Sequence, residues 1–218
     1  MSLTVDSAPA TRQLANSAST LSYSFTYAGG SGAIYVAALC TANADISTVT
    51  WNGAALTRLI TQTTAGASDL EIWRLLNPSG SGAQNVVITL TGSTTYILAT
   101  TLSLLGNIGA GGATNASATA SNSITVANGS WVVIAGSSDS VDVAASTNVT
   151  ATPTANPVIG YYGPKSGAGS TTLDFTGSGA LSVAVEVIDN SAGGSSVPMS
   201  VVTNHQGTVF ASAAHRAV

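Results

Sequence analysis

Short runs that alternate apolar with polar or β-branched residues, interrupted by Gly or Pro, cover most of the chain. Within Asn85–Thr91, the residues Val86, Ile88 and Leu90 share one face, as in a strand with one side in a core. Helical periodicity is almost absent. The pattern predicts strands at about Leu21–Tyr27, Ala33–Cys40, Ser47–Trp51, Ala54–Thr61, Leu70–Leu76, Asn85–Thr91, Tyr96–Leu104, Ser123–Val126, Trp131–Ala135, Asn148–Thr152, Val158–Tyr162, Thr171–Phe175 and Leu181–Ile188.

The pair Asn52-Gly53 predicts one hairpin. It separates the β-rich segments Val49–Trp51 and Leu56–Leu59. Asn and Gly tolerate positive φ, which a two-residue turn between antiparallel strands requires.

A block of similar sequence occurs twice. An aromatic strand, a Pro/Gly turn and a Thr-rich strand ending in Thr-Gly-Ser are found in Trp73–Ser93 and again in Tyr161–Ser178, and Pro78 and Pro164 lie 86 residues apart. We therefore expect an all-β, jelly-roll-like antiparallel β-sandwich of about 11 to 13 short strands. It would consist of two loosely repeated halves, most simply packed face to face.

Segments with weaker patterns flank and join these strands. Gly106–Ser121 is typical of a long loop between the halves, and Asp189–Val197 of a flexible linker. The sandwich is thus expected over residues 21–188, with an N-terminal arm at 1–20 and a C-terminal segment at 189–218. That segment is either a disordered tail or an interchain arm with apolar contacts from Met199, Val201, Val202, Val209 and Phe210.

Charged residues are scarce. The 218 residues include five Lys or Arg and nine Asp or Glu, which is 6% of the chain, against roughly 25% in an average domain. The basic residues are scattered, which argues against nucleic acid as a partner. A weakly charged surface of Ser, Thr, Asn and Gln repels its neighbours weakly and favours association with copies of itself.

The location of the protein is indicated by three features. Cys40 is the only cysteine, so the fold does not depend on an intrachain disulfide. The first 20 residues lack the basic and apolar regions of a secretory signal. No apolar run reaches the roughly 18 residues of a membrane helix. We expect a protein made in the host cytoplasm, without a membrane partner.

The inventory of reactive side chains argues against an enzyme. Both histidines, His205 and His215, lie in the tail without a metal-ligand pattern. The acidic stretch Ser138–Asp142 is more typical of a solvated turn than of a calcium site. We expect no catalytic residue, no metal and no cofactor. Glu186 is the one acid to examine; it faces solvent or pairs with an Arg, and it needs a partner if it is buried.

Three aromatic residues are candidate contacts for a partner or a glycan: Trp73, Tyr161 and Tyr162. Trp73 shares a strand face with Asp69 and Glu71, which indicates an outer face. Tyr161 and Tyr162 are adjacent, so one of them should point outward. Exposed rings stack on sugars and also dock subunits. A core position is about equally supported for Trp73, and it is the favoured interpretation for the other two tryptophans, Trp51 and Trp131.

Two strings together resemble a known module. Ser47–Thr57 (STVTWNGAALT) and Leu70–Pro78 (LEIWRLLNP), followed by a Gly-rich turn and a Val/Thr strand, look like a β-sandwich module of phage virion and tail-associated proteins and of some bacterial surface proteins. The similarity extends over about Leu21 to Ile188 and implies a fold and a setting, without an active site. The absence of a secretory signal favours the virion.

Two functions follow as hypotheses. The first is a non-enzymatic virion structural protein, namely a capsid decoration, surface-fibre or tail accessory subunit. It would bind copies of itself and other virion proteins through its faces and terminal arms. The second is a carbohydrate-binding module that recognises cell-surface glycans through Trp73 or the Tyr161–Tyr162 pair.

Overall fold

The computed structural model describes residues 2–7, 13–41, 44–63, 68–138, 142–146, 148–151, 156–176, 181–191, 202–203 and 209–210. These residues contain no helix, and therefore none that could cross a membrane. All pairings between strands are antiparallel, so the all-β prediction is confirmed. The strands are β1 (Thr4–Ser7), β2 (Gln13–Tyr27), β3 (Gly32–Thr41), β4 (Ile46–Trp51), β5 (Ala54–Ala55), β6 (Thr57–Thr63), β7 (Ser68–Leu76), β8 (Gly82–Leu105), β9 (Thr114–Ser117), β10 (Ser121–Val126), β11 (Trp131–Ser137), β12 (Ala144–Ala145), β13 (Val158–Tyr162), β14 (Gly169–Thr176), β15 (Leu181–Val187), β16 (Val202–Thr203) and β17 (Val209–Phe210).

The first half of the molecule, β1–β8, is organised by the 24-residue strand β8. Its N-terminal part, up to Leu90, pairs with β4 and with the C-terminal part of β2, which forms an outer sheet. Its C-terminal part, from Thr94, pairs with β3, β1 and the N-terminal part of β2, and β3 continues to β7 and β6 in an inner sheet. The predicted hairpin at Asn52-Gly53 joins β4 to β5, with φ of 49° and 76°.

The second half, β9–β15, repeats these pairings. Its inner sheet has the order β13-β11-β15-β9, and its outer sheet the order β10-β14-β12. Strand β11 lies between β13 and β15 as β3 lies between β7 and β8, and β10 pairs with β14 as β2 pairs with the start of β8. Two halves with the same pairings are therefore present, as the repeated sequence block indicates.

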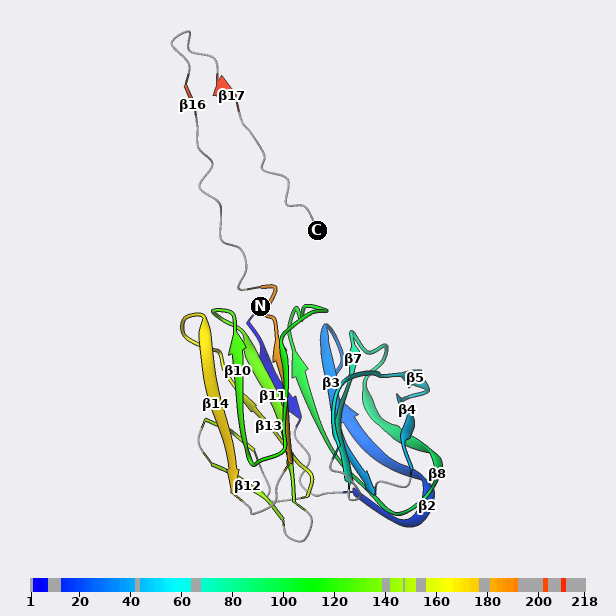
Figure 1. The fold of residues 1–218 in the computed structure, drawn as a ribbon. Coiled ribbons are helices and arrows are strands. Elements are labelled where there is room, and N and C mark those ends of the chain that lie inside the picture. Colours follow the sequence, from blue (N-terminus) through cyan, green and yellow to red (C-terminus); the bar gives the residue numbers. More distant parts are fainter. Residues whose placement is uncertain are drawn as a thin grey trace.

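The strands of the first half form one hydrogen-bonded sheet of eight strands, which folds along β2 and β8 into an inner and an outer layer. With the two sheets of the second half, this gives four layers around three apolar cores (Figure 1). The first core lies between the two layers of the first half and contains Trp51 and Ile88. A second core fills the other half around Phe175. The central core joins the two inner sheets through residues such as Tyr35 and Val133. The halves do pack face to face, but each also has an outer sheet, so the molecule has four layers instead of the two of a single sandwich.

The expected N-terminal arm is wrong for the residues that the structure describes. Thr4–Ser7 pairs with the end of β8, and Gln13–Ala18 pairs with its middle. Leu3 is 3% exposed within the central core. Apolar contacts and backbone hydrogen bonds thus hold this segment in the body.

The start of the expected linker also belongs to the body. The carbonyl of Ile188 accepts a hydrogen bond from Gly109, and the N–H of Asn190 donates to Asn107. The Asp189 carboxylate accepts the N–H of Leu3 at 3.2 Å. The folded body therefore extends to about Ser191.

Two short strands lie in the C-terminal segment. Val202 pairs with Phe210 and Thr203 with Val209, and this ribbon of β16 and β17 forms a sheet of its own. The other two apolar residues proposed for the arm, Met199 and Val201, lie outside the described residues.

Candidate functional site

Trp73 is buried, so its expected position on an outer face is wrong. The residue is 7% exposed and packs in the first core. Its strand β7 belongs to an inner sheet, where one face meets the central core and the other meets the first core. Alternation along the strand cannot identify a solvent face when both faces are covered.

The tyrosine pair lies on β13, which is also covered on both sides. Tyr161 packs against the central core and stacks on Trp131, with ring centroids 5.6 Å apart and planes inclined by 26°. Tyr162 packs against the second core. Both are half-buried, so neither ring points fully into solvent, as was expected of one of them.

Trp73 is one of two hydrogen-bond donors to the buried acid Glu71. Glu71 is 3% exposed, and its carboxylate accepts hydrogen bonds from the Trp73 indole at 2.6 Å and from Arg58 at 3.0 Å. Arg58 also lies 5.9 Å from the centre of the Trp73 ring, within cation–π range. Burial raises the pKa of Glu71, although the hydrogen bonds from Trp73 and Arg58 oppose this. Each oxygen of the buried carboxylate thus has a hydrogen-bond donor, which gives these three residues a structural role.

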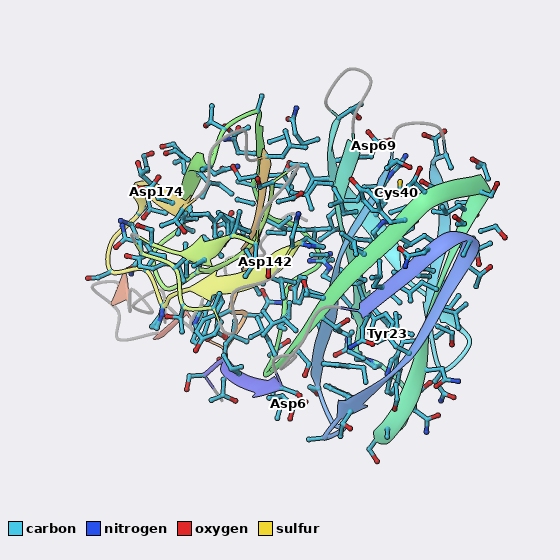
Figure 2. The ribbon with its side chains drawn as sticks, turned by 90° about the horizontal axis from the view of Figure 1, so that it is seen from below. Asp6, Tyr23, Cys40, Asp69, Asp142 and Asp174 are labelled. Atoms are coloured by element: carbon cyan, nitrogen blue, oxygen red, sulfur yellow. The ribbon has the colours of Figure 1, made fainter. Side chains whose placement is uncertain are left out.

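Asp69 and Cys40 lie next to this network, paired across β7 and β3 (Figure 2). Asp69 is 9% exposed, and its Oδ1 has no hydrogen-bond partner among the described residues. Burial and the neighbouring acids Asp69, Glu71 and Asp45 raise the pKa of the Cys40 thiol to about 12. Such a thiol stays protonated and unreactive at neutral pH.

Glu186 is buried, so it does not face solvent as expected, and its partners are backbone N–H groups and not an Arg. Its Oε2 accepts the backbone N–H of Ala113 at 2.9 Å and its Oε1 that of Ala127 at 2.7 Å. Burial alone would raise its pKa, but these bonds and one from the Ser130 hydroxyl outweigh burial, and the pKa is lowered. Glu186 thus fastens the connection between the halves and the β10–β11 turn onto β15, because it satisfies their N–H groups.

No group of three His, Cys, Asp or Glu side chains within the described part of the chain is arranged to hold a metal ion. Both histidines, His205 and His215, lie outside that part, and so does most of the acidic stretch at 138–142.

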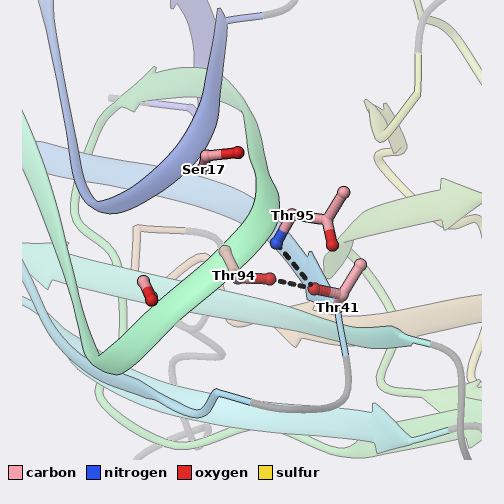
Figure 3. A pocket seen from close by; sticks show the side chains of 5 residues that line it. Ser17, Thr41, Thr94 and Thr95 are labelled. Atoms are coloured by element: carbon pink, nitrogen blue, oxygen red, sulfur yellow. Dashed lines mark hydrogen bonds between the residues drawn. The ribbon is translucent and has the colours of Figure 1, made fainter.

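Two open grooves on the first half are lined by polar groups. One, of about 290 Å³, lies where β2 and β8 bend together, and Thr41 there hydrogen-bonds to Thr94 (Figure 3). The other, of about 490 Å³, runs over the outer sheet beside the β4–β5 turn. It is lined by Thr50, Asn52, Gly53, Ala83, Gln84, Asn85 and Val87. Sequence reasoning sought rings and acids and missed both grooves; the one available signal was the hairpin at Asn52, which brings β4 beside β8.

The grooves offer hydroxyl, amide and backbone groups to a ligand, and no titratable side chain lines either of them. Such groups bind polar ligands by hydrogen bonds. Comparison with known proteins adds no assignment: no family model, no curated protein and no solved structure matches this chain.

Proposed function

We propose that the protein is a non-enzymatic virion structural subunit that acts through contacts with copies of itself and with other virion proteins. The observation that carries this proposal is the C-terminal ribbon. Among the described strands, β16 and β17 pair with each other and with nothing else.

A two-stranded ribbon is marginally stable at best in water and needs a further surface to pack on. This ribbon has two residues in each strand, and it follows a body whose described part extends to Ser191. A neighbouring subunit supplies the surface in the proposal. The virion setting rests on the resemblance of the Ser47–Thr57 and Leu70–Pro78 strings, and the scarcity of charge supports close packing between subunits.

The test is the mass in solution, measured by light scattering coupled to size exclusion. The full chain is compared with a chain ending at Ser191, which keeps the Asp189 contacts of the body. We expect a defined oligomer for the full chain and loss of that oligomer on truncation. A Val202→Ser, Phe210→Ser double variant should behave like the truncation, and Thr203→Ser should behave like the wild type. A full chain that is monomeric at millimolar concentration and unchanged by truncation would contradict the proposal.

A second candidate function is glycan binding at the outer-sheet groove. The groove is lined by Thr50, Asn52 and Asn85, whose hydroxyl and amide groups suit a ligand rich in hydroxyls. A glycan array tests it with Asn85→Ala, and with Thr48→Ala on the same sheet as the control. Binding that is lost only in Asn85→Ala would favour this function; an array without signal for the wild type would remove it.

A further inference from the structure

The outer sheet of the first half ends in an unpaired strand edge. The segment Thr20–Tyr27 of β2 pairs with β8 on one side. On its other side, no strand among the described residues pairs with it. We call this side the β2 edge. An unpaired edge of this length is a template on which another strand can add.

The direction of the backbone groups follows from one hydrogen bond. Asn52 donates its N–H to the carbonyl of Asn85, so the backbone groups of Asn85 face β4. In an antiparallel ladder, the residue opposite Asn85 on the other strand, Ser24, therefore directs its own N–H and C=O away from β8. The same holds at every second residue, so Thr20, Ser22, Ser24 and Thr26 present their N–H and C=O groups at the β2 edge.

The β2 edge also lacks the features that block strand addition elsewhere in this molecule. β5 and β12, the opposite edges of the outer sheets, have two residues each. β6 has a bulge after Arg58 and carries that charge. In the second half, the equivalent edge is partly closed, because Thr119 bonds to both backbone groups of Ser121.

By contrast, β2 has 15 residues without a single charge or proline. Its one register shift lies between Ala18 and Thr20, where the β2 edge begins, and Thr20–Tyr27 pairs with β8 without a further shift. Edge strands of soluble proteins are normally kept from pairing by Lys, Pro or bulges.

We infer that the β2 edge of one copy receives the C-terminal ribbon, β16–β17, of another copy, which extends the outer sheet by main-chain hydrogen bonds. This inference rests on the proposed function and names its interface. The two elements are complementary: the β2 edge has no strand paired with it, and the ribbon belongs to no larger sheet among the described strands. Neither β2 nor the ribbon strands carry a charge that would oppose pairing, and Val202, Val209 and Phe210 are residues that strands favour.

The experiment measures binding of a labelled peptide, residues 198–211, to the chain ending at Ser191 by fluorescence anisotropy. Ser24→Pro removes one outward N–H without touching the ladder to β8, and Ser24→Lys places a charge at the edge. Thr48→Lys is the matched control, an exposed Thr of the same sheet that lies beyond β8. Circular dichroism and melting curves establish that each variant folds.

We expect saturable binding that is weakened at least about tenfold by each Ser24 variant and changed less than about twofold by Thr48→Lys. Absence of peptide binding, or binding that ignores Ser24, would overturn the inference. The assembly function would then still stand if the full chain alone forms the oligomer. If the truncated chain associates with itself through Ser24, the occupant is the β2 edge of a second copy and our assignment is wrong. A monomeric full chain whose ribbon covers its own β2 edge would refute both the interface and the proposed function.

Discussion

Replacement of Glu186 by Gln tests whether a buried carboxylate holds the second half together. The carboxylate accepts three hydrogen bonds, from the N–H groups of Ala113 and Ala127 and from the Ser130 hydroxyl. Gln has nearly the same shape but only one acceptor oxygen. Its NH₂ group must face one of the two backbone N–H groups, which are donors as well.

The expected cost follows from those contacts. One charge-assisted hydrogen bond is lost, worth about 1.5–3 kcal/mol, and one buried N–H loses its acceptor. We expect Glu186→Gln to lower the free energy of unfolding by about 2–4 kcal/mol at neutral pH. Urea denaturation monitored by tryptophan fluorescence measures this difference.

The pH dependence of this difference is the sharper part of the prediction. The pKa of Glu186 is lower in the folded than in the unfolded chain. Its stabilisation is therefore fully present above the ordinary glutamate pKa of about 4.3 and is lost as the pH falls through the folded value. The difference between wild type and Glu186→Gln should be constant from pH 7 to about 5 and shrink below about 4.

Glu71→Gln is the internal control, because the pKa of Glu71 is shifted in the opposite direction, mainly by burial. Its folded form holds the proton more tightly, so the stability linked to that proton is present below the ordinary pKa and lost as the pH rises through the folded value. As the pH falls, the free energy of unfolding of the wild type should therefore rise relative to that of Glu71→Gln. If both variants show the same pH trend, or if Glu186→Gln costs less than about 0.5 kcal/mol, the assignment of these two roles is refuted.

Three further predictions concern packing and reactivity. Gly32→Ala should lower the free energy of unfolding by about 3 kcal/mol or more, because the new Cβ would lie 2.2 Å from the Leu104 carbonyl oxygen. Gly92→Ala is the control: its Cβ would have no atom within 4 Å, so thermal unfolding should be nearly unchanged. Trp73→Ala should lower the free energy of unfolding in urea by about 3–5 kcal/mol, because it leaves a cavity in the first core and removes a hydrogen-bond donor from the buried Glu71 carboxylate; a neutral result would contradict the buried position of Trp73. The Cys40 thiol should not react with a disulfide reagent at pH 8 until the chain is unfolded, and rapid labelling of the folded protein would show that the thiol is accessible.

The sequence was sufficient for the strand content, one turn and the repeat. Alternation in Asn85–Thr91 and the Asn52-Gly53 pair are local signals, and local backbone preferences decide them. The repeated block predicted two equivalent halves because equal spacing of turns and strands leads to equal pairings. Strand ends were less accurate: residues 82–105 form one continuous strand that bends, which was predicted as two.

Sites could not be predicted in the same way, since burial depends on how many layers the sheets form. A strand covered on both sides and a strand with one solvent-exposed face both accept the sequence Asp69–Leu76. Trp73 is buried because the outer layer of the first half covers it, and Tyr161 is half-buried because its side of β13 faces the central core between the halves. Glu186 was recognised as an unusual acid, but its partners are backbone N–H groups, which leave no mark in the sequence.

The central core has a consequence for synthesis on the ribosome. The first half is complete at Leu105, but the inner sheet that carries Tyr35, Leu39 and Ile72 is covered only when β11 and β15 have formed. At about 5–20 residues per second, translation from Leu105 to Val187 takes about 4 to 16 s. For that interval the nascent chain displays a broad apolar sheet face, and chaperone occupancy during translation should peak there and end once the second half has folded.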